Sequence, residues 1–192
     1  MLPDTPPPLA GAITDRAFAE MLEPGETPLD VVKRHPIGIV GLYLEALVAV
    51  AAVLSLIFLI APDILSDLSK QSNRFIVAGS VFAVAILIFV LLIATYAYRL
   101  NKLLITDRNL IQITQRALFG RSITRLSIAT VEEVNVEQKG ILATIFNYGN
   151  LLIQTAGARP NFLFKTTPDP NRYANRINQA RQAYAESLKE RP

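Results

Sequence analysis

The chain has 192 residues, no cysteine, one histidine and a net charge of +3. Without cysteine it has neither disulfides nor thiolate chemistry, and a single histidine excludes His-rich metal sites and paired catalytic histidines. Hydrophobic residues make up 51% of the sequence and gather in two long runs, a composition that points to a membrane protein.

Residues 1–36 hold 3 Lys/Arg and 6 Asp/Glu, and we expect them to form an N-terminal cytoplasmic tail. Two apolar runs follow, at about 37–61 and 75–98. A helix rises about 1.5 Å per residue and a bilayer core is about 30 Å thick, so each run is long enough to span it. A buried helix pair in a soluble protein is the alternative, but a small domain rarely encloses two such runs. Residues 37–98 are therefore predicted to be a transmembrane hairpin.

Basic residues flank the outer ends of the hairpin more heavily than its connection. They are Lys33, Arg34, Arg99, Lys102 and Arg108, against Lys70 and Arg74 in the connection. The positive-inside bias then predicts a multi-pass protein of the cell membrane with both termini in the cytoplasm.

Glu45 is the one charged residue inside the two apolar runs. A carboxyl group at that depth is costly and marks a candidate functional position. It is also explained if the side chain reaches the near headgroups, faces the partner helix or is protonated. The second run offers no charged partner for it, so a transporter is not expected.

After residue 98 the hydrophobic period changes from helical to two, and a domain over 99–188 is predicted. Its expected strands cover 103–106, 109–115, 122–128, 132–138, 151–155 and 162–165. Residues 140–147 are expected to form a short helical turn or a loop that plugs the core. A closing helix is predicted over 168–188, with Thr167 as its N-cap and one apolar stripe of Tyr173, Ile177, Ala180 and Tyr184. The class is α+β: a transmembrane hairpin followed by a small antiparallel sheet or partial barrel with a C-terminal capping helix.

An ordered set of short motifs in this region resembles the bacterial pleckstrin-homology-like domain of the YdbS-like family. The motifs are Thr106-Asp107-Arg108, Gly120-Arg121, the stretch 128–136, Tyr148-Gly149-Asn150-Leu151 and the Pro-containing helix start at 168–177. The resemblance implies a pleckstrin-like partial barrel closed by a helix and anchored at the membrane, and it implies no established reaction.

No catalytic or nucleotide-binding motif is found in the sequence. The carboxylates Glu132, Glu133 and Glu137 lie on an expected sheet edge without a base or metal partner, as on a solvated polar face. We therefore expect a protein that is not an enzyme and that uses no cofactor and no metal.

Residues 99–192 hold 14 Lys/Arg and 7 Asp/Glu, a net charge of +7, which favours an anionic leaflet. The candidate lipid-binding loop runs from Arg116 to Arg121, where Leu118 and Phe119 form an apolar tip between two cations. Alternatively, these two apolar side chains fold back and close the barrel. Nucleic acid is not an expected partner, because the aromatic residues of the last helix fall on its core stripe.

The expected function is a basic cytoplasmic module, carried by the hairpin, that docks on anionic lipid headgroups. The alternative is a membrane-anchored scaffold that binds a protein partner or another copy of the chain. Small-residue pairs in the spans, Ala51 with Ser55 and Gly79 with Ala83, are consistent with close helix packing.

Overall fold

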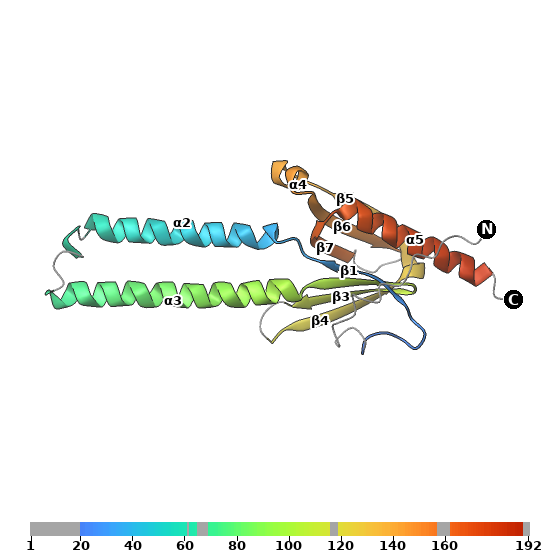
Figure 1. Cartoon of the computed structure of the whole chain (residues 1–192), viewed down its shortest axis with the longest axis horizontal. Coiled ribbons are helices and arrows are strands. Elements are labelled where there is room, and N and C mark those ends of the chain that lie inside the picture. Colours follow the sequence, from blue (N-terminus) through green and yellow to red (C-terminus); the bar gives the residue numbers. More distant parts are fainter. Residues whose placement is uncertain (1–19, 61, 65–68, 116–118, 157–161, 190–192) are drawn as a thin grey trace. The chain divides into compact units, whose positions relative to one another are not determined.

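The computed structural model describes residues 20–60, 62–64, 69–115, 119–156 and 162–189. The chain divides into two compact units (Figure 1). One is a helical hairpin, Pro36–Tyr98. The other, which we call the β module, combines the residues up to His35 with those from Arg99 onward. In the sequence, the hairpin therefore lies between two parts of the β module, and does not simply precede the module.

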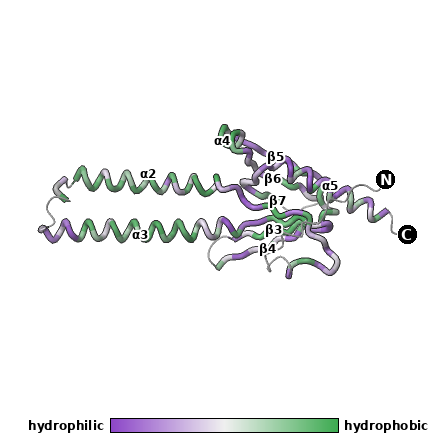
Figure 2. Tube along the Cα trace, viewed as in Figure 1, coloured by the Kyte–Doolittle hydropathy of each residue, from purple (hydrophilic) through white to green (hydrophobic). Residues whose placement is uncertain are grey.

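The hairpin consists of two long apolar helices, α2 (Ile37–Ile60) and α3 (Gln71–Leu100), with the short 3-10 helix η1 (Pro62–Ile64) after α2. Both are long and apolar enough to cross a membrane, judged by length and composition, and most of their length is coloured as hydrophobic in Figure 2. The hydroxyl groups of Tyr43 and Thr95 share a 2.7 Å hydrogen bond between them. Glu45 lies on α2 with its side chain exposed.

The first sheet of the β module is antiparallel, with the strand order β1-β2-β3-β4. Its strands are β1 (Pro28–Lys33), β2 (Lys102–Thr106), β3 (Asn109–Gln115) and β4 (Arg121–Ser127). A single turn of 3-10 helix, η2 (Ile128–Thr130), leads from this sheet into the next one. Every strand expected in this stretch is present, within one residue at each end.

The second sheet has the antiparallel order β5-β6-β7. It contains β5 (Val131–Glu137), β6 (Tyr148–Thr155) and β7 (Phe162–Pro168), with the five-residue helix α4 (Ile141–Ile145) between β5 and β6. Along β6 every second residue is buried, as expected for a strand with one face on the core. The last helix, α5 (Pro170–Lys189), packs against β5, β6 and η2.

One core joins both sheets and α5. Leu103, Leu110, Leu151, Phe164 and Ile177 are among its fully buried members. The stripe expected on the last helix is confirmed: Ile177 and Ala180 are buried, and Tyr173 and Tyr184 pack against the core at its margin. A smaller cluster of Leu104, Ile111 and Ile113 lies outside this core, with Met21, Leu22 and Val31 packed against it.

The N-terminal region differs from the expected tail. Residues 28–33 form strand β1, which pairs with β2 from Pro28 opposite Thr106 to Lys33 opposite Lys102. Val32 of this strand is fully buried in the main core. The β module therefore extends beyond the expected range of 99–188, because its first strand precedes the hairpin.

The last helix begins later than expected. Thr167 and Pro168 still belong to β7, where they pair with Gly149 and Tyr148. Asp169 then takes a positive φ of 40° and its backbone N–H donates to the Asn147 carbonyl at 2.8 Å. The helix starts at Pro170, where a missing N–H leaves no helical bond unmade.

Candidate functional site

The strand register brings many chain segments to one end of the β module, which we call the junction end. Here β1 finishes at Lys33 opposite the start of β2 at Lys102, and β3 finishes opposite the start of β4. In the second sheet, Glu137 of β5 pairs with Asn150, and Tyr148 of β6 pairs with Pro168 of β7. The chain passes to α2 after His35 and returns from α3 at this same end.

His35 ties the two sheets together at the junction end. Its backbone N–H donates to the Thr166 carbonyl at 2.6 Å. Its ring stacks on Tyr148 with centroids 5.5 Å apart and an interplanar angle of 23°. Beside it, the Arg34 guanidinium lies 5.8 Å from the centre of the Phe164 ring. The last residues before α2 are thus fixed to β6 and β7.

Asn101 fixes the returning chain. This residue is 3% exposed. Its side-chain oxygen accepts the Gln115 N–H at 3.0 Å, and its amide nitrogen donates to the Gln115 carbonyl at 3.3 Å. The end of β3, where the expected lipid-binding loop begins, is therefore held beside the start of β2.

The expected lipid-binding residues are described in part. Arg116 and Leu118 lie outside the described residues. Phe119 is 98% exposed, so its side chain does not fold back to close the barrel. Arg121 is exposed at the first position of β4. The described portion of this loop therefore presents an aromatic ring and a cation to the surroundings at the junction end.

A second apolar loop lies at the same end, between β5 and β6. Residues 141–145 form a helical turn, as expected, but they do not plug the core. Ile141 is 79% exposed and Ile145 is 68% exposed, and only Ala143 is buried. Its uncharged sequence is the one signal that could have identified it, and the same pattern also fits a core plug.

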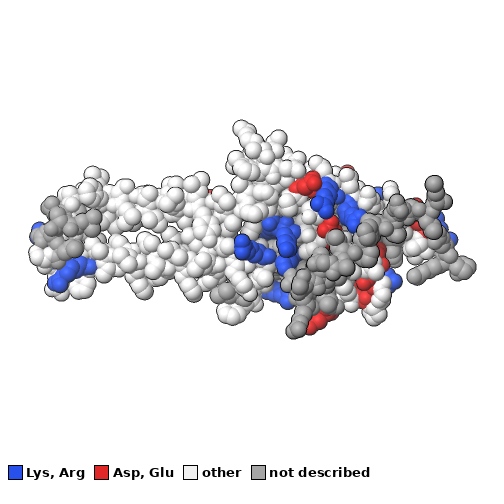
Figure 3. All heavy atoms as spheres, viewed as in Figure 1, with Lys and Arg blue, Asp and Glu red and all other residues white. Residues whose placement is uncertain are grey.

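Basic side chains surround these loops. The described cations at the junction end include Lys33, Arg34, Arg99, Lys102, Arg121, Lys139 and Arg172, and the described acids there include Glu137 and Asp169. Lys139 and Glu137 form an exposed ion pair, which holds the pKa of the Glu137 carboxyl below its usual range. In Figure 3 the charged side chains lie on the β module and at the connection of the hairpin, while the helical surface between is almost uncharged.

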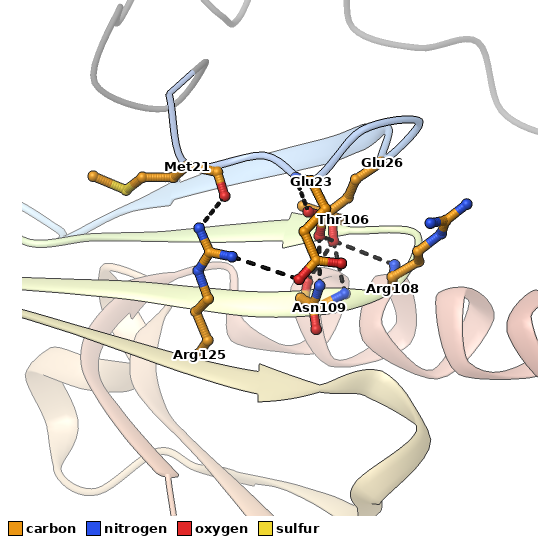
Figure 4. A network of polar contacts seen from close by, with 7 residues as sticks. All are labelled: Met21, Glu23, Glu26, Thr106, Arg108, Asn109 and Arg125. Carbon is orange, nitrogen blue, oxygen red and sulfur yellow. Dashed lines mark hydrogen bonds and ion pairs between the residues drawn. The ribbon is translucent and has the colours of Figure 1, made fainter.

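The opposite end of the module is closed by a polar network, shown in Figure 4. We call it the latch end; it comprises residues 23–27, the β2–β3 turn and the last turns of α5. Glu26 is 6% exposed and accepts hydrogen bonds from the Thr106 hydroxyl, the Asn109 amide at 2.9 Å and the Glu23 N–H at 2.8 Å. Burial raises the pKa of Glu26, but these bonds and the nearby Arg125 charge outweigh it and leave the pKa below 4.5.

The partners of Glu26 are hydrogen-bond donors that join the N-terminal segment to the β2–β3 turn. Arg125 adds an ion pair with Glu23 and donates a hydrogen bond to the Met21 carbonyl. Glu132 and Glu133 are exposed on β5. Among the described residues, no group of three or more His, Cys, Asp or Glu side chains is arranged to hold a metal ion.

A groove of about 760 Å³ runs along the latch end between α5 and the β2–β3 turn. Leu29, Tyr184 and Leu188 supply apolar wall, and Arg108 and Arg176 supply cations. The carboxylates of Glu23 and Asp107 also line it, so its charge is mixed.

Comparison with known proteins identifies one family. Residues 36–181 match the family model described as "Bacterial PH domain". A solved structure of a protein with a pleckstrin-homology domain from Shewanella loihica is also similar. It is 16% identical, with a TM-score of 0.35, over 42% of this chain and 70% of that chain. No curated protein matches. The assignment to a family rests on the sequence match, which covers both apolar helices and most of the β module.

Proposed function

Because this chain belongs to the bacterial PH domain family, we propose that it is a membrane-anchored PH-like module that docks on anionic lipid headgroups. The hairpin spans the cell membrane with both chain termini in the cytoplasm, and the junction end of the β module faces the leaflet that the helices enter. It acts by binding and performs no catalysis, and its partner is lipid, not nucleic acid.

The observation that carries this proposal is the exposure of Phe119 at the basic junction end. The Phe119 ring is 98% exposed two residues before the exposed cation of Arg121, and apolar side chains flanked by cations suit the boundary between acyl chains and headgroups. The neighbouring cations each gain about 1 kcal/mol near an anionic leaflet. His35 and Asn101 fix the segments of the β module that precede α2 and follow α3 to the end of the module that carries this ring.

The proposal is tested with the full chain in vesicles. The chain has no native cysteine, so Gly120→Cys gives a unique site for an environment-sensitive fluorophore beside Phe119, and Ser187→Cys gives one at the latch end. We expect the Gly120 label to shift to the blue when phosphatidylglycerol replaces part of the phosphatidylcholine, and salt to reverse the shift. The Ser187 label should not respond.

Charge variants sharpen that experiment. Arg121→Gln should weaken the response of the Gly120 label, whereas Lys189→Gln, which removes an exposed cation from the end of α5, should leave it unchanged. A response that is the same in neutral and anionic vesicles would contradict anionic docking. A response unaffected by Arg121→Gln would remove this residue from the site.

The alternative function, a membrane-anchored scaffold, is favoured by the groove along α5. Its mixed charge and apolar wall fit a segment of a partner protein or of a second copy of the chain. Crosslinking of the full chain in native membranes would then give a defined adduct that Leu188→Arg abolishes. A monomer without a crosslinked partner would contradict the scaffold.

A further inference from the structure

The loop between β5 and β6 exposes more apolar side chain than any other described part of the β module. We call residues 140–146 the α4 loop. Its large side chains are exposed to the following fractions: Ile141 79%, Leu142 56%, Ile145 68% and Phe146 49%. In Figure 2 the helix α4 is coloured as strongly hydrophobic. Such an exposed cluster marks an interaction surface in a folded protein.

Hydrogen bonds fix the conformation of the α4 loop, both inside the loop and at its base. Within it, Phe146 N–H donates to the Leu142 carbonyl at 3.0 Å and Thr144 N–H to the Gly140 carbonyl at 3.3 Å. At its base, the Gln138 amide donates to the Asn147 side chain at 3.2 Å, and the Asn147 carbonyl accepts the Asp169 N–H. The backbone bonds inside the loop reduce the cost of moving it out of water.

The α4 loop lies at the end of the β module from which the chain continues into α2. Tyr148, the first residue of β6, stacks on His35, and α2 begins two residues after His35. At about 1.5 Å per residue, the five-residue α4 is only about 8 Å long. The apolar side chains therefore belong to the same end of the β module as His35, the last residue of the module before the hairpin.

The chemistry of the loop agrees with this position. The described stretch 140–156, which follows Lys139, contains no charged residue. The Thr144 hydroxyl lies 3.4 Å from the Gly140 carbonyl. At the base of the loop, Lys139 and Glu137 form an ion pair. The loop thus changes from charged at its base to apolar at its tip, as a leaflet changes from headgroups to acyl chains.

We propose that the α4 loop inserts Ile141, Leu142, Ile145 and Phe146 into the acyl-chain boundary of the leaflet that α2 enters. The inference rests on the proposed function, since it requires the hairpin to span that membrane. The loop comes from the second sheet, whereas Phe119 comes from the first. Two contacts from separate sheets, together with the hairpin, restrain how the β module tilts on the leaflet.

The chain contains no tryptophan, so single replacements report depth without background. Three variants of the full chain are reconstituted in phosphatidylcholine–phosphatidylglycerol vesicles whose acyl chains carry bromine. Ile145→Trp reports on the α4 loop, Phe58→Trp on the last turn of α2, and Leu188→Trp on the latch end. We expect bromine to reduce the emission of Ile145→Trp and Phe58→Trp but not that of Leu188→Trp. The Leu188→Trp variant introduces the same side chain, so it controls for the tendency of tryptophan itself to enter interfaces.

A double substitution in the loop tests whether the apolar side chains cause the insertion. Adding Ile141→Ser and Leu142→Ser to the Ile145→Trp chain should reduce the loss of emission, because two of the inserting side chains are removed. Emission of Ile145→Trp that bromine does not quench, while Phe58→Trp is quenched, would overturn this inference and leave headgroup docking by Phe119 standing. Blue-shifted, unquenched emission would assign the loop to a protein surface. If Phe58→Trp is not quenched, the membrane anchor itself fails and both proposals fall.

Discussion

The two ends of the β module use their side chains in opposite ways. At the latch end a buried carboxylate is satisfied by three hydrogen-bond donors of the same chain. At the junction end the strands are fixed just as firmly, by His35 and Asn101, but large apolar side chains point outward. The difference predicts that substitutions of inward-facing residues at the latch end lower stability, whereas substitutions of the exposed apolar side chains at the junction end leave stability nearly unchanged.

The largest effect is expected from Glu26→Ala at the latch end. The substitution leaves the donors of Thr106, Asn109 and Glu23 without their acceptor in a buried position, at a cost of about 2–3 kcal/mol in unfolding free energy. Urea unfolding of the full chain in detergent, followed by circular dichroism, measures it. Glu23→Ala is the matched control, because it removes an exposed carboxylate 3.7 Å from Arg125 and should cost less than about 1 kcal/mol.

The strand that carries the α4 loop provides a second test, Gly149→Ala. A Cβ atom at this position would lie 2.9 Å from the Glu137 carbonyl oxygen and 3.1 Å from Pro170. Since the backbone must move, we expect a loss of about 1–3 kcal/mol in the same unfolding assay. Gly79→Ala in α3, where no atom lies within 4 Å of the new Cβ, should be neutral. Equal effects of the two alanines would show that β6 does not pack closely against β5 here.

Acid should loosen the latch end first. The folded-state pKa of Glu26 is below its ordinary value of 4.5, so the unfolded chain binds the proton more readily. The stabilisation is complete well above pH 4.5 and is lost as the pH falls below it. Stability measured between pH 7 and pH 3 should therefore decline, and Glu26→Gln should flatten part of that decline. An unchanged slope in the variant would mean that the carboxylate is not held in its charged form.

The smallest effect on stability is expected at the junction end. Ile141→Ser and Ile145→Ser change exposed side chains, so each should alter the unfolding free energy in detergent by less than about 0.5 kcal/mol. The same variants should weaken the anionic-lipid response of the label at Gly120→Cys. Loss of stability without a change in lipid response would make these residues part of the fold, and the comparison of the two ends would fail.

Sequence patterns predicted those parts of the fold that depend on local periodicity. The stripe on α5 follows the 3.6-residue period, and β3 follows the period of two, so both emerge from composition within a short window. The long helices follow from length and hydropathy in the same way.

The parts that were missed depend on contacts between distant residues. Strand β1 has only six residues, and its partner β2 follows the hairpin in the sequence. Nothing in the local sequence therefore marks β1 as part of a sheet. The bond between Thr106 and Glu26 joins residues 80 positions apart. For the α4 loop, the apolar residues were visible in the sequence, but whether Ile145 faces the core or the surroundings is decided by packing.

The most direct test of the account is a comparison of membrane depth at the two ends. Nitroxide labels at Gly120→Cys and Ser187→Cys in the full chain, reconstituted in anionic vesicles, are exposed to oxygen and to a water-soluble nickel chelate. If the junction end faces the leaflet, oxygen will relax the label at Gly120→Cys more than the chelate does, and the label at Ser187→Cys will show the reverse. Equal access of the chelate to both labels would contradict docking through the junction end.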